Sequence, residues 1–416
     1  MCPDAAADPV RRKALGAWYT PEALVDHVVA LTLPAGSRAG RRITVLDPAC
    51  GDGRFLTAIA HRLGPDVELT GVDVDEAAVR AARTAVPHAE IVHGDALALD
   101  WGDRRFDVVI GNPPFLNQLA SATSRGGASR FGGGPYANTA AEFLALAAHL
   151  ARPDGGRVGL VLPQSMLTTR DAAPIRDRVV ADAAVVHAWW SDTFMFDAVV
   201  RTCAIVLERG MVAGDVSRTN GASFAPIAAA RWTGSWGALL LHEPALLPTG
   251  SDRCLGDIAT FAADFRDQYY GLVGAVGDDV DGPPLVTSGL IEPGRCLWGE
   301  RPVKFAKQRF EAPRVELSKL TPKLQAWAGR RLVPKLLIAN QTRVIEVVDD
   351  PAGAWLPSVP VITCTTADPA VRQRVLEVLG GDDALGWVRH HGAGSGLAAG
   401  TVRLSPALLA SIPLPS

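Results

Sequence analysis

The feature that most constrains the fold is an alternation of short apolar runs with helical patterns between residues 43 and 110. The runs short enough for strands lie at 43–47, 68–73, 90–92 and 107–110, and helical patterns occupy 55–63 and 77–85. Strand–helix repetition of this kind predicts a parallel sheet with helices on both faces. The pattern continues with helices at 140–151 and 175–181 and strands at 158–162, 183–189 and 203–207. We therefore predict an α/β domain that ends near Arg209.

A chain of 416 residues is long enough for more than one domain, and we expect two. Residues 1–210 form the α/β domain in this prediction. Residues 211–250, rich in small residues and without clean periodicity, form a connector. Residues 251–416, with short strands and many prolines, form a smaller mixed α/β domain.

Composition narrows the class of protein. No apolar run reaches the roughly 18 residues of a membrane span, and the N-terminus lacks a secretory pattern, so we expect a cytoplasmic protein that does not contact a membrane. The six cysteines are scattered, with no Cys-x-x-Cys pair. We therefore expect neither a metal site nor a disulfide framework.

A glycine-rich turn after the first predicted strand indicates a cofactor site. The segment 45–53 (VLDPACGDG) places Asp47 at the tip of the strand and glycines where backbone can pass close to a ligand. The next strand ends at Asp73, and a carboxylate about 20 residues on can accept both hydroxyls of a ribose. With no phosphate-binding loop in the sequence, this pair suits a nucleoside cofactor that carries a cationic sulfonium and an amino-acid tail. Asp95, after the third strand, can hold the adenine amino group, although Asp is also common in solvated turns.

A second motif, Asn112-Pro113-Pro114-Phe115, follows the fourth strand at the edge where open α/β sheets bind ligands. An amino group conjugated to an aromatic ring is a poor nucleophile because its lone pair is delocalised. If the Asn112 side-chain oxygen and the Pro113 carbonyl each accept one amino hydrogen, the lone pair can rehybridise toward a methyl donor. The prolines keep these acceptors aimed, and Phe115 offers a flat surface for a base. In isolation the same residues could be an ordinary turn.

Together these motifs resemble the adenine-N6 DNA methyltransferases of the gamma arrangement, in which motif X precedes motif I, and in size the Taq-type members. The resemblance rests on Tyr19-Thr20-Pro21, Asp47-Pro48-Ala49-Cys50-Gly51, Asp73, Asp95 and Asn112-Pro113-Pro114-Phe115. It implies a seven-stranded Rossmann-like methyltransferase domain that binds S-adenosylmethionine, followed by a DNA-recognition domain. It also implies that the catalytic residues are Asn112, Pro113, Pro114 and Phe115. The cofactor contacts it implies are Tyr19, Thr20, Asp47, Ala49, Cys50, Gly51, Asp73, Asp95, Asn112 and Phe143.

The resemblance leaves some positions open. Phe143 matches an aromatic that packs on the cofactor adenine, but it also fits the core of an amphipathic helix. The family stacks a second aromatic on the extruded target base; Phe194 and Phe196 are the candidates beside Phe115, and we favour Phe196. Asp52 stands where many members have Ser, so it either helps to bind the cofactor amino group or caps the following helix.

The second domain is where we expect duplex DNA to bind. The net charge of the chain is −3, yet residues 300–345 contain eleven Lys/Arg against three acids, with Trp298, Phe305, Phe310 and Trp327 at or near this stretch. Rotating a base out of the duplex requires a second gripping surface of this kind. The expected DNA-binding residues are Arg330, Arg331, Lys335 and Arg343. For any one of them a solvated surface charge is the alternative.

Three other functions remain open. The Asn-Pro-Pro-aromatic motif also serves RNA adenine and protein glutamine amides, because it selects a planar amino group. Motif order and the long basic region after the core favour DNA. A non-catalytic DNA-binding subunit is a third alternative, against which the intact motifs argue. We expect a monomer of a restriction-modification or phage-defence system, with any cleavage supplied by a separate restriction endonuclease.

Overall fold

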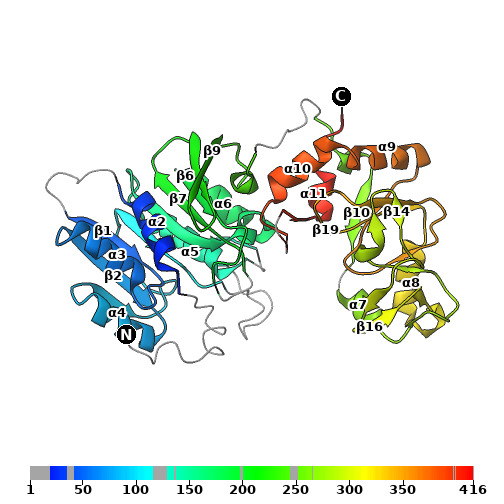
Figure 1. The fold of residues 1–416 in the computed structure, drawn as a ribbon, viewed down its shortest axis with the longest axis horizontal. Helices are drawn as coiled ribbons and strands as arrows, with labels where there is room; N and C mark the ends of the chain where they lie inside the picture. The colour runs from blue at the N-terminus through cyan, green and yellow to red at the C-terminus, as the bar shows by residue number, and fades with distance from the viewer. Residues whose placement is uncertain are drawn as a thin grey trace. The chain divides into compact units, whose positions relative to one another are not determined.

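The computed structural model describes residues 19–34, 42–115, 129–134, 137–196, 200–243, 252–264, 266–396, 398 and 400–415. Contacts divide the chain into two compact units, Met1–Glu243 and Pro244–Ser416 (Figure 1). None of the helices in the described part of the chain has the length and apolar character needed to cross a membrane. Across the same residues, no group of three or more His, Cys, Asp or Glu side chains is placed to hold a metal ion.

The first unit is built on one nine-stranded sheet with the order β3-β2-β1-β4-β5-β7-β6-β8-β9. Its strands are β1 (Ile43–Asp47), β2 (Val67–Asp73), β3 (Glu90–His93), β4 (Val108–Gly111), β5 (Arg157–Pro163), β6 (Ala183–Trp190), β7 (Thr202–Arg209), β8 (Asp215–Asn220) and β9 (Ala225–Arg231). The strands from β3 to β5 are parallel, whereas β7 runs antiparallel to both of its neighbours. The parallel α/β architecture predicted for this region is therefore present.

The expectation of seven strands was wrong, because the segment predicted as a connector contains two more. Strand β8 pairs in parallel with β6, and β9 returns antiparallel to β8. Their sequence lacks the alternation that marks a half-buried strand: most side chains of β9 are exposed, and only Val216 and Arg218 of β8 are buried. Backbone pairing along the open edge of β6 forms these strands instead. The sheet therefore continues beyond residue 210, where we predicted the α/β domain to end.

Helices pack on this sheet in two groups. Helices α2 (Glu22–Thr32), α3 (Arg54–Leu63) and α4 (Glu76–Ala85) contribute apolar side chains to one core with β1, β2 and β4. Helices α5 (Thr139–Leu150) and α6 (Ala173–Val180) pack on each other, α5 against β4 and β5 and α6 against β6. In α3, Phe55, Leu56 and Ile59 recur at helical spacing and are all buried. This packing fixes the strand ends at which the predicted motifs lie.

The second unit contains a four-stranded antiparallel sheet with the order β10-β22-β18-β20. These strands are Thr260–Ala263, Ile362–Thr365, Lys335–Ile338 and Val347–Asp350. Helices α9 (Pro369–Leu379), α10 (Asp382–Gly392) and α11 (Pro406–Ala410) share a core with the sheet. A separate core joins α7 (Arg266–Leu272), α8 (Pro322–Arg331) and a hairpin of β15 (Val303–Phe305) and β16 (Gln308–Phe310).

The remaining strands described in the second unit are two residues long and pair in twos. They are β11 (Val276–Gly277), β12 (Leu285–Val286), β13 (Ile291–Glu292), β14 (Arg295–Cys296), β17 (Arg314–Val315), β19 (Gln341–Thr342), β21 (Leu356–Pro357) and β23 (Val402–Arg403). Such short pairings need support from side-chain packing, because an isolated two-stranded ribbon is only marginally stable in water. Here the cores around α7 and β18 supply that support.

Candidate active site

The predicted motifs meet at one edge of the nine-stranded sheet. Asp73, Asp47 and Gly111 are the last residues of β2, β1 and β4, which are neighbours in the order β2-β1-β4. Because these strands are parallel, their carboxyl ends lie along the same edge. The glycine-rich turn and the Asn-Pro-Pro-Phe loop therefore leave the sheet side by side.

The Asp73 carboxylate organises the glycine-rich turn. Its Oδ2 accepts the Gly51 N–H at 2.8 Å, and its Oδ1 accepts the Asp75 N–H at 2.8 Å. Gly51 adopts a φ of +54°, a left-handed conformation that favours glycine. Burial raises the pKa of the half-buried Asp73 above its ordinary value, although these backbone donors lower it. Since an ionised carboxylate has about four lone-pair positions, Asp73 can hold the turn and still accept hydroxyl groups.

Asp47 is a nearly inaccessible acid, with 1% of its surface exposed. Its Oδ1 accepts the Ala49 N–H at 3.1 Å. Burial, reinforced by the nearby carboxylates of Asp73 and Asp52, raises the pKa of Asp47 to about 8. A cationic ligand group beside this carboxyl would favour its ionised form and reverse the shift.

Gly111 allows the Asn-Pro-Pro-Phe loop to begin against Asp47. A Cβ atom at position 111 would lie 2.4 Å from Asp47 Oδ1, closer than such atoms approach one another. Gly111, the last residue of β4, was not among the residues predicted for the site. Glycine is needed at this position because the end of β4 closely approaches a buried carboxyl.

Thr20 connects the segment before α2 to the Asn-Pro-Pro-Phe loop. Asn112 Nδ2 donates to Thr20 Oγ1 at 3.0 Å, and Thr20 is 4% exposed. The Thr20 carbonyl in turn accepts from Arg54 Nη1 at 3.2 Å. The structure thus brings together two motifs that are 92 residues apart in the sequence.

Arg54 is a site residue that the sequence analysis missed. Its guanidinium lies 5.0 Å from the centre of the Tyr19 ring, and its Nε pairs with Asp52 Oδ2 at 2.9 Å. It is the first residue of α3, where a cation opposes the helix dipole. The unfavourable position of this cation at the start of a helix could have been recognised in the sequence, because such a residue usually has a specific partner. Asp52 therefore has an ion-pair partner instead of acting as a helix cap.

The other cofactor candidates differ in exposure. Asp95 is exposed and its Oδ1 accepts the Leu97 N–H at 3.0 Å, which is a local Asx turn. Phe143 is 5% exposed within α5. Cys50 is buried beside Asp47 and Asp73, and burial raises the pKa of its thiol well above the ordinary range, so the thiol is unreactive.

The aromatic candidates for base stacking separate in the same way. Phe115 and Phe196 are half-buried and pack against the core shared by α2, α3 and β1. Phe194 is 49% exposed. Exposure makes Phe194 the more accessible ring, whereas Phe196 is the one we favoured from the sequence. Pro113 is buried and Pro114 is half-buried.

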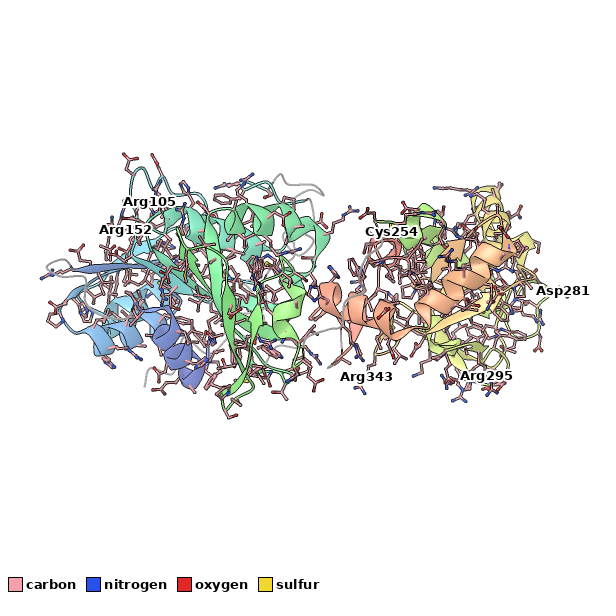
Figure 2. The ribbon with its side chains drawn as sticks, turned by 90° about the horizontal axis from the view of Figure 1, so that it is seen from above. Arg105, Arg152, Cys254, Asp281, Arg295 and Arg343 are labelled. Carbon is pink, nitrogen blue, oxygen red and sulfur yellow. The ribbon has the colours of Figure 1, made fainter. Side chains whose placement is uncertain are left out.

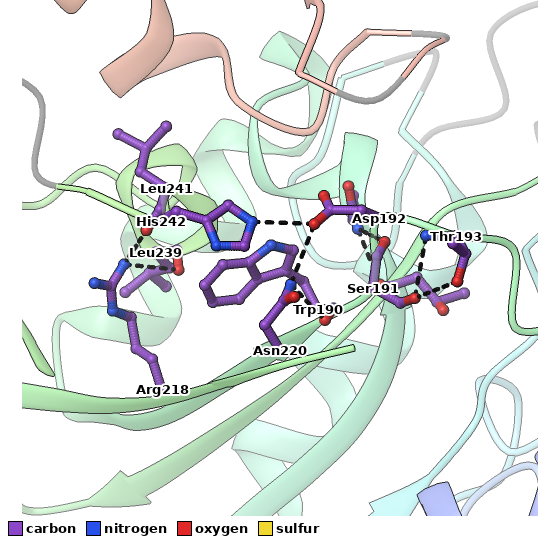
Figure 3. A network of polar contacts seen from close by, with 11 residues as sticks. Trp190, Ser191, Asp192, Thr193, Arg218, Asn220, Leu239, Leu241 and His242 are labelled. Atoms are coloured by element: carbon purple, nitrogen blue, oxygen red, sulfur yellow. Dashed lines mark hydrogen bonds and ion pairs between the residues drawn. The ribbon is translucent and has the colours of Figure 1, made fainter. Parts of the chain in front are cut away.

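A polar network holds the segment that carries Phe194 and Phe196 (Figure 3). Asp192 Oδ2 lies 3.0 Å from His242 Nε2, and Asn220 Nδ2 donates to the Trp190 carbonyl at 3.1 Å. The His242 ring also packs edge-on against Trp190. These contacts tie the start of the segment to β8 and to the last described residues of the first unit.

The four residues predicted to contact DNA have different environments. Arg330 and Arg343 are exposed, and Figure 2 shows Arg343 at the surface of the second unit. Arg331 donates from Nε and Nη2 to the Asp264 carboxylate at 2.6 to 3.2 Å. Two of the four predicted cations are therefore free to meet a phosphate without breaking a carboxylate pair.

Lys335 corrects the prediction most clearly. It is 0% exposed in the centre of the small sheet, and its Nζ lies 2.5 Å from Asp350 Oδ2. A buried cation with a carboxylate partner stabilises the unit and cannot reach DNA, so its assignment to the DNA-binding set was wrong. Of the interleaved aromatics, Phe305 and Trp327 are also core residues.

Comparison with known proteins agrees with these motifs. Residues 7–222, more than half of the chain, match the family model described as N-6 DNA methylase. The chain is 38% identical over 104 residues to the Type II methyltransferase M.TthHB8I of Thermus thermophilus, covering 25% of this chain and 22% of that protein. It is 22% identical over 211 residues to the modification methylase CviBIII of Paramecium bursaria Chlorella virus NC1A, covering 48% of this chain and 51% of that protein.

These curated relatives are matched over about half of their length or less. A solved structure of the Type IIL restriction-modification enzyme MmeI in complex with DNA matches 98% of this chain and 69% of that chain. The TM-score is 0.60 and the sequence identity is 14%, which is a likeness of fold alone.

Proposed function

The chain belongs to the N-6 DNA methylase family, and we propose that it transfers a methyl group from S-adenosylmethionine to the N6 amino group of adenine in a specific double-stranded DNA sequence. One observation carries the proposal: Asn112 and Pro113 leave β4 directly beside the buried Asp47 and the turn that Asp73 holds. Two acceptors for an amino group thus stand next to two carboxyls and a glycine-rich turn of the kind that suits a cationic nucleoside.

The acceptors act by position. The Thr20 hydroxyl accepts from the Asn112 amide nitrogen, which fixes the rotation of that side chain and so directs its oxygen. With the Pro113 carbonyl, that oxygen can accept the two hydrogens of an adenine amino group and turn its lone pair toward the methyl group. Removing one well-placed partner of this kind typically costs about a hundredfold to a thousandfold in rate.

The residues present fit S-adenosylmethionine, which is the cofactor of this family and supplies the methyl group as a sulfonium. Asp47 is buried beside the turn, and a cationic group there would offset the burial that raises its pKa. Gly51 exposes backbone at the turn, and Asp73 retains acceptor capacity for ribose hydroxyls. Tyr19, packed by Arg54, flanks the same turn, since a Cβ at Gly51 would lie 3.9 Å from the Tyr19 ring.

The target amino group is inside the duplex, so the base must rotate out of the stack. Phe115 and one of Phe194 and Phe196 are the rings we assign to holding it. We further propose that residues 251–416 recognise the DNA sequence and that the protein acts as a cytoplasmic monomer. A restriction-modification or phage-defence system, with a separate restriction endonuclease as partner, is the setting we propose.

The experiment that tests the function is a transfer assay with labelled S-adenosylmethionine and, in parallel, duplex DNA, RNA and a protein extract. Hydrolysis of each product then identifies the labelled residue. We expect N6-methyladenine from duplex DNA. Label found only in RNA or as methylglutamine would replace the DNA assignment with one of those substrates, and no transfer to any of them would favour a non-catalytic DNA-binding subunit.

A further inference from the structure

The cations of the basic stretch in the second unit differ in their carboxylate partners and in their positions. Carboxylates hold several of its members: Arg301 pairs with Glu292, Lys319 with Glu316, Arg331 with Asp264 and Lys335 with Asp350. Three others lie together on the hairpin of β15 and β16, which we call the cationic hairpin (residues 303–310). They are Lys304, Lys307 and Arg309, and all three are exposed.

The cationic hairpin concentrates positive charge, although repulsion between these charges destabilises its strand pairing. Lys304 and Arg309 are directly opposite each other in the strand register, where like charges destabilise a pair of strands. Residues 303–310 contain no acid, and the nearest in sequence, Glu311, lies 3.1 Å from Arg309 Nε at an exposed position. A pair of surface charges of this kind contributes at most about 1 kcal/mol and is screened by salt, so it leaves the hairpin positive.

The backbone conformation of the hairpin turn is also unfavourable. Ala306 and Lys307 are its two central residues, with φ of 48° and 67°. A two-residue turn with both values positive normally takes Asn and Gly, because side chains with a Cβ are disfavoured there. Lys307 occupies the second position, where glycine fits best, so a lysine side chain stands at the hairpin tip at a conformational cost.

The hairpin is also anchored to α7 by contacts with Tyr269. The Tyr269 hydroxyl accepts the Ala306 N–H at 3.0 Å, and the Tyr269 ring lies 4.8 Å from that of Phe305, which is 2% exposed. Helix α7, which carries Tyr269, packs so closely on α8 that a Cβ at Gly271 would lie 2.3 Å from Leu324 Cδ1. The three elements appear together in Figure 1.

An exposed aromatic residue follows Tyr269 on α7. This residue, Tyr270, is 65% exposed and packs edge-on against the Tyr269 ring at 5.5 Å. A tyrosine ring on a rigid helix offers apolar contact and a hydroxyl at little entropic cost on binding. Tyr269 contacts the hairpin, whereas Tyr270 is exposed and can be reached by a ligand.

We propose that the cationic hairpin and Tyr270 bind the sugar-phosphate backbone of duplex DNA, with Lys307 at the tip as a phosphate contact. Lys and Arg side chains contact phosphate oxygens, and a two-stranded ribbon fits the width of the DNA major groove. This inference rests on the proposed function and moves the main DNA contact from the residues predicted from sequence to the hairpin. An acidic protein partner is the alternative, and for such a surface Lys307→Gly should leave DNA affinity and its salt slope unchanged.

The deciding variant is Lys307→Gly in the full chain, because it removes the charge and relieves the turn at the same time. A random-sequence fluorescent duplex reports binding by anisotropy over a range of salt concentrations, and thermal unfolding reports stability. We expect weaker binding and a salt slope smaller by about 0.9, so that the loss in affinity is about 3.5-fold larger at 50 mM than at 200 mM salt. The unfolding temperature should stay the same or rise.

Lys319→Ala is the matched control, since it removes one exposed lysine of the same unit that already pairs with Glu316 at 2.7 Å. Its DNA affinity and salt slope should equal those of the unmodified protein. Tyr270→Ala should weaken binding without changing the salt slope, because no charge is lost, and Tyr270→Phe should restore most of the affinity.

Two failures are distinguishable. If the unmodified protein binds and methylates duplex DNA but Lys307→Gly has the affinity and slope of Lys319→Ala, the hairpin inference is wrong and the proposed function stands. If the unmodified protein binds no DNA but methylates RNA or protein, both fall. Equal losses of DNA affinity in Lys307→Gly and Lys319→Ala would reduce the effect to net charge and also overturn the inference.

Discussion

Replacing the buried acid of the candidate cofactor pocket, Asp47→Asn, should stabilise the cofactor-free protein, by an amount that grows with pH. Burial holds the pKa of Asp47 near about 8, whereas an unfolded chain ionises it at 3.8. Between these values the unfolded state loses the proton first, so ionisation favours unfolding progressively as pH rises. An asparagine carries no such cost, and its side-chain oxygen can still accept the Ala49 N–H.

The magnitude follows from the separation of the two pKa values, because each pKa unit corresponds to about 1.36 kcal/mol. The free energy of unfolding of the variant should therefore exceed that of the unmodified protein by about 3 kcal/mol near pH 6 and about 5 kcal/mol near pH 8. Below about pH 4 both states of Asp47 hold the proton and the difference vanishes. Above about pH 8 the folded state ionises too, and the difference stays constant.

Urea unfolding of both proteins across this pH range measures the difference directly, through midpoints at equal slope. Adding S-adenosylmethionine should reverse the order of stability, because its cationic groups favour the ionised Asp47 and have no such partner in the variant. A difference that does not change with pH, or an unmodified protein that is the more stable near pH 8, would refute the reasoning.

Three further substitutions test other parts of the account. Gly111→Ala should lower the unfolding free energy by about 1 to 3 kcal/mol and weaken cofactor binding in a calorimetric titration, because the new Cβ meets Asp47 at 2.4 Å; unchanged binding would mean that the strand end can move away. Lys335→Met should cost about 3 to 5 kcal/mol in urea unfolding by stranding the Asp350 carboxylate, yet leave the salt slope of DNA binding unaltered, and a changed slope would return Lys335 to the DNA surface. His187→Gln should flatten the loss of stability on acidification: burial lowers the pKa of His187 to about 4, so its contribution is present above about pH 6.5 and lost as pH falls toward about 4, and an acid limb identical in both proteins would contradict this.

The sequence predicted the part of the fold in which apolar strands alternate with amphipathic helices. Apolar runs alternating with amphipathic helices located β1, β2 and β4 within about one or two residues, because strands buried on both faces carry a strong hydrophobic signal. Strands β8 and β9 had no such signal. Their side chains are largely exposed, and pairing with the edge of β6 is a long-range event that local sequence does not record.

In the candidate site, too, some residues were predicted from the sequence and others were not. Motif spacing placed Asp47, Asp73 and Asn112 at neighbouring strand ends, since the carboxyl ends of parallel strands share an edge. The contacts of Arg54 with Tyr19 and Thr20 join segments far apart in sequence, and only the folded chain reveals them.

In the second unit, charge composition located a basic region but could not separate its surface from its core. Lys335 and Arg330 are five positions apart, yet one lies in the centre of a sheet and the other on the exposed side of a helix. A count of charges in the sequence treats these two cations as equivalent. Burial and the positions of Asp264 and Asp350 decide which cations remain available, and these depend on the tertiary fold.

The central claim is that Asn112 positions an adenine amino group for methylation, and nucleoside analysis of duplex DNA after reaction with S-adenosylmethionine tests it most directly. The unmodified protein should produce N6-methyladenine. Asn112→Ala should produce it at least about a hundredfold more slowly while its affinity for the cofactor stays nearly the same. Transfer that survives in Asn112→Ala, or a methyl group found on a different atom of the DNA, would contradict the account.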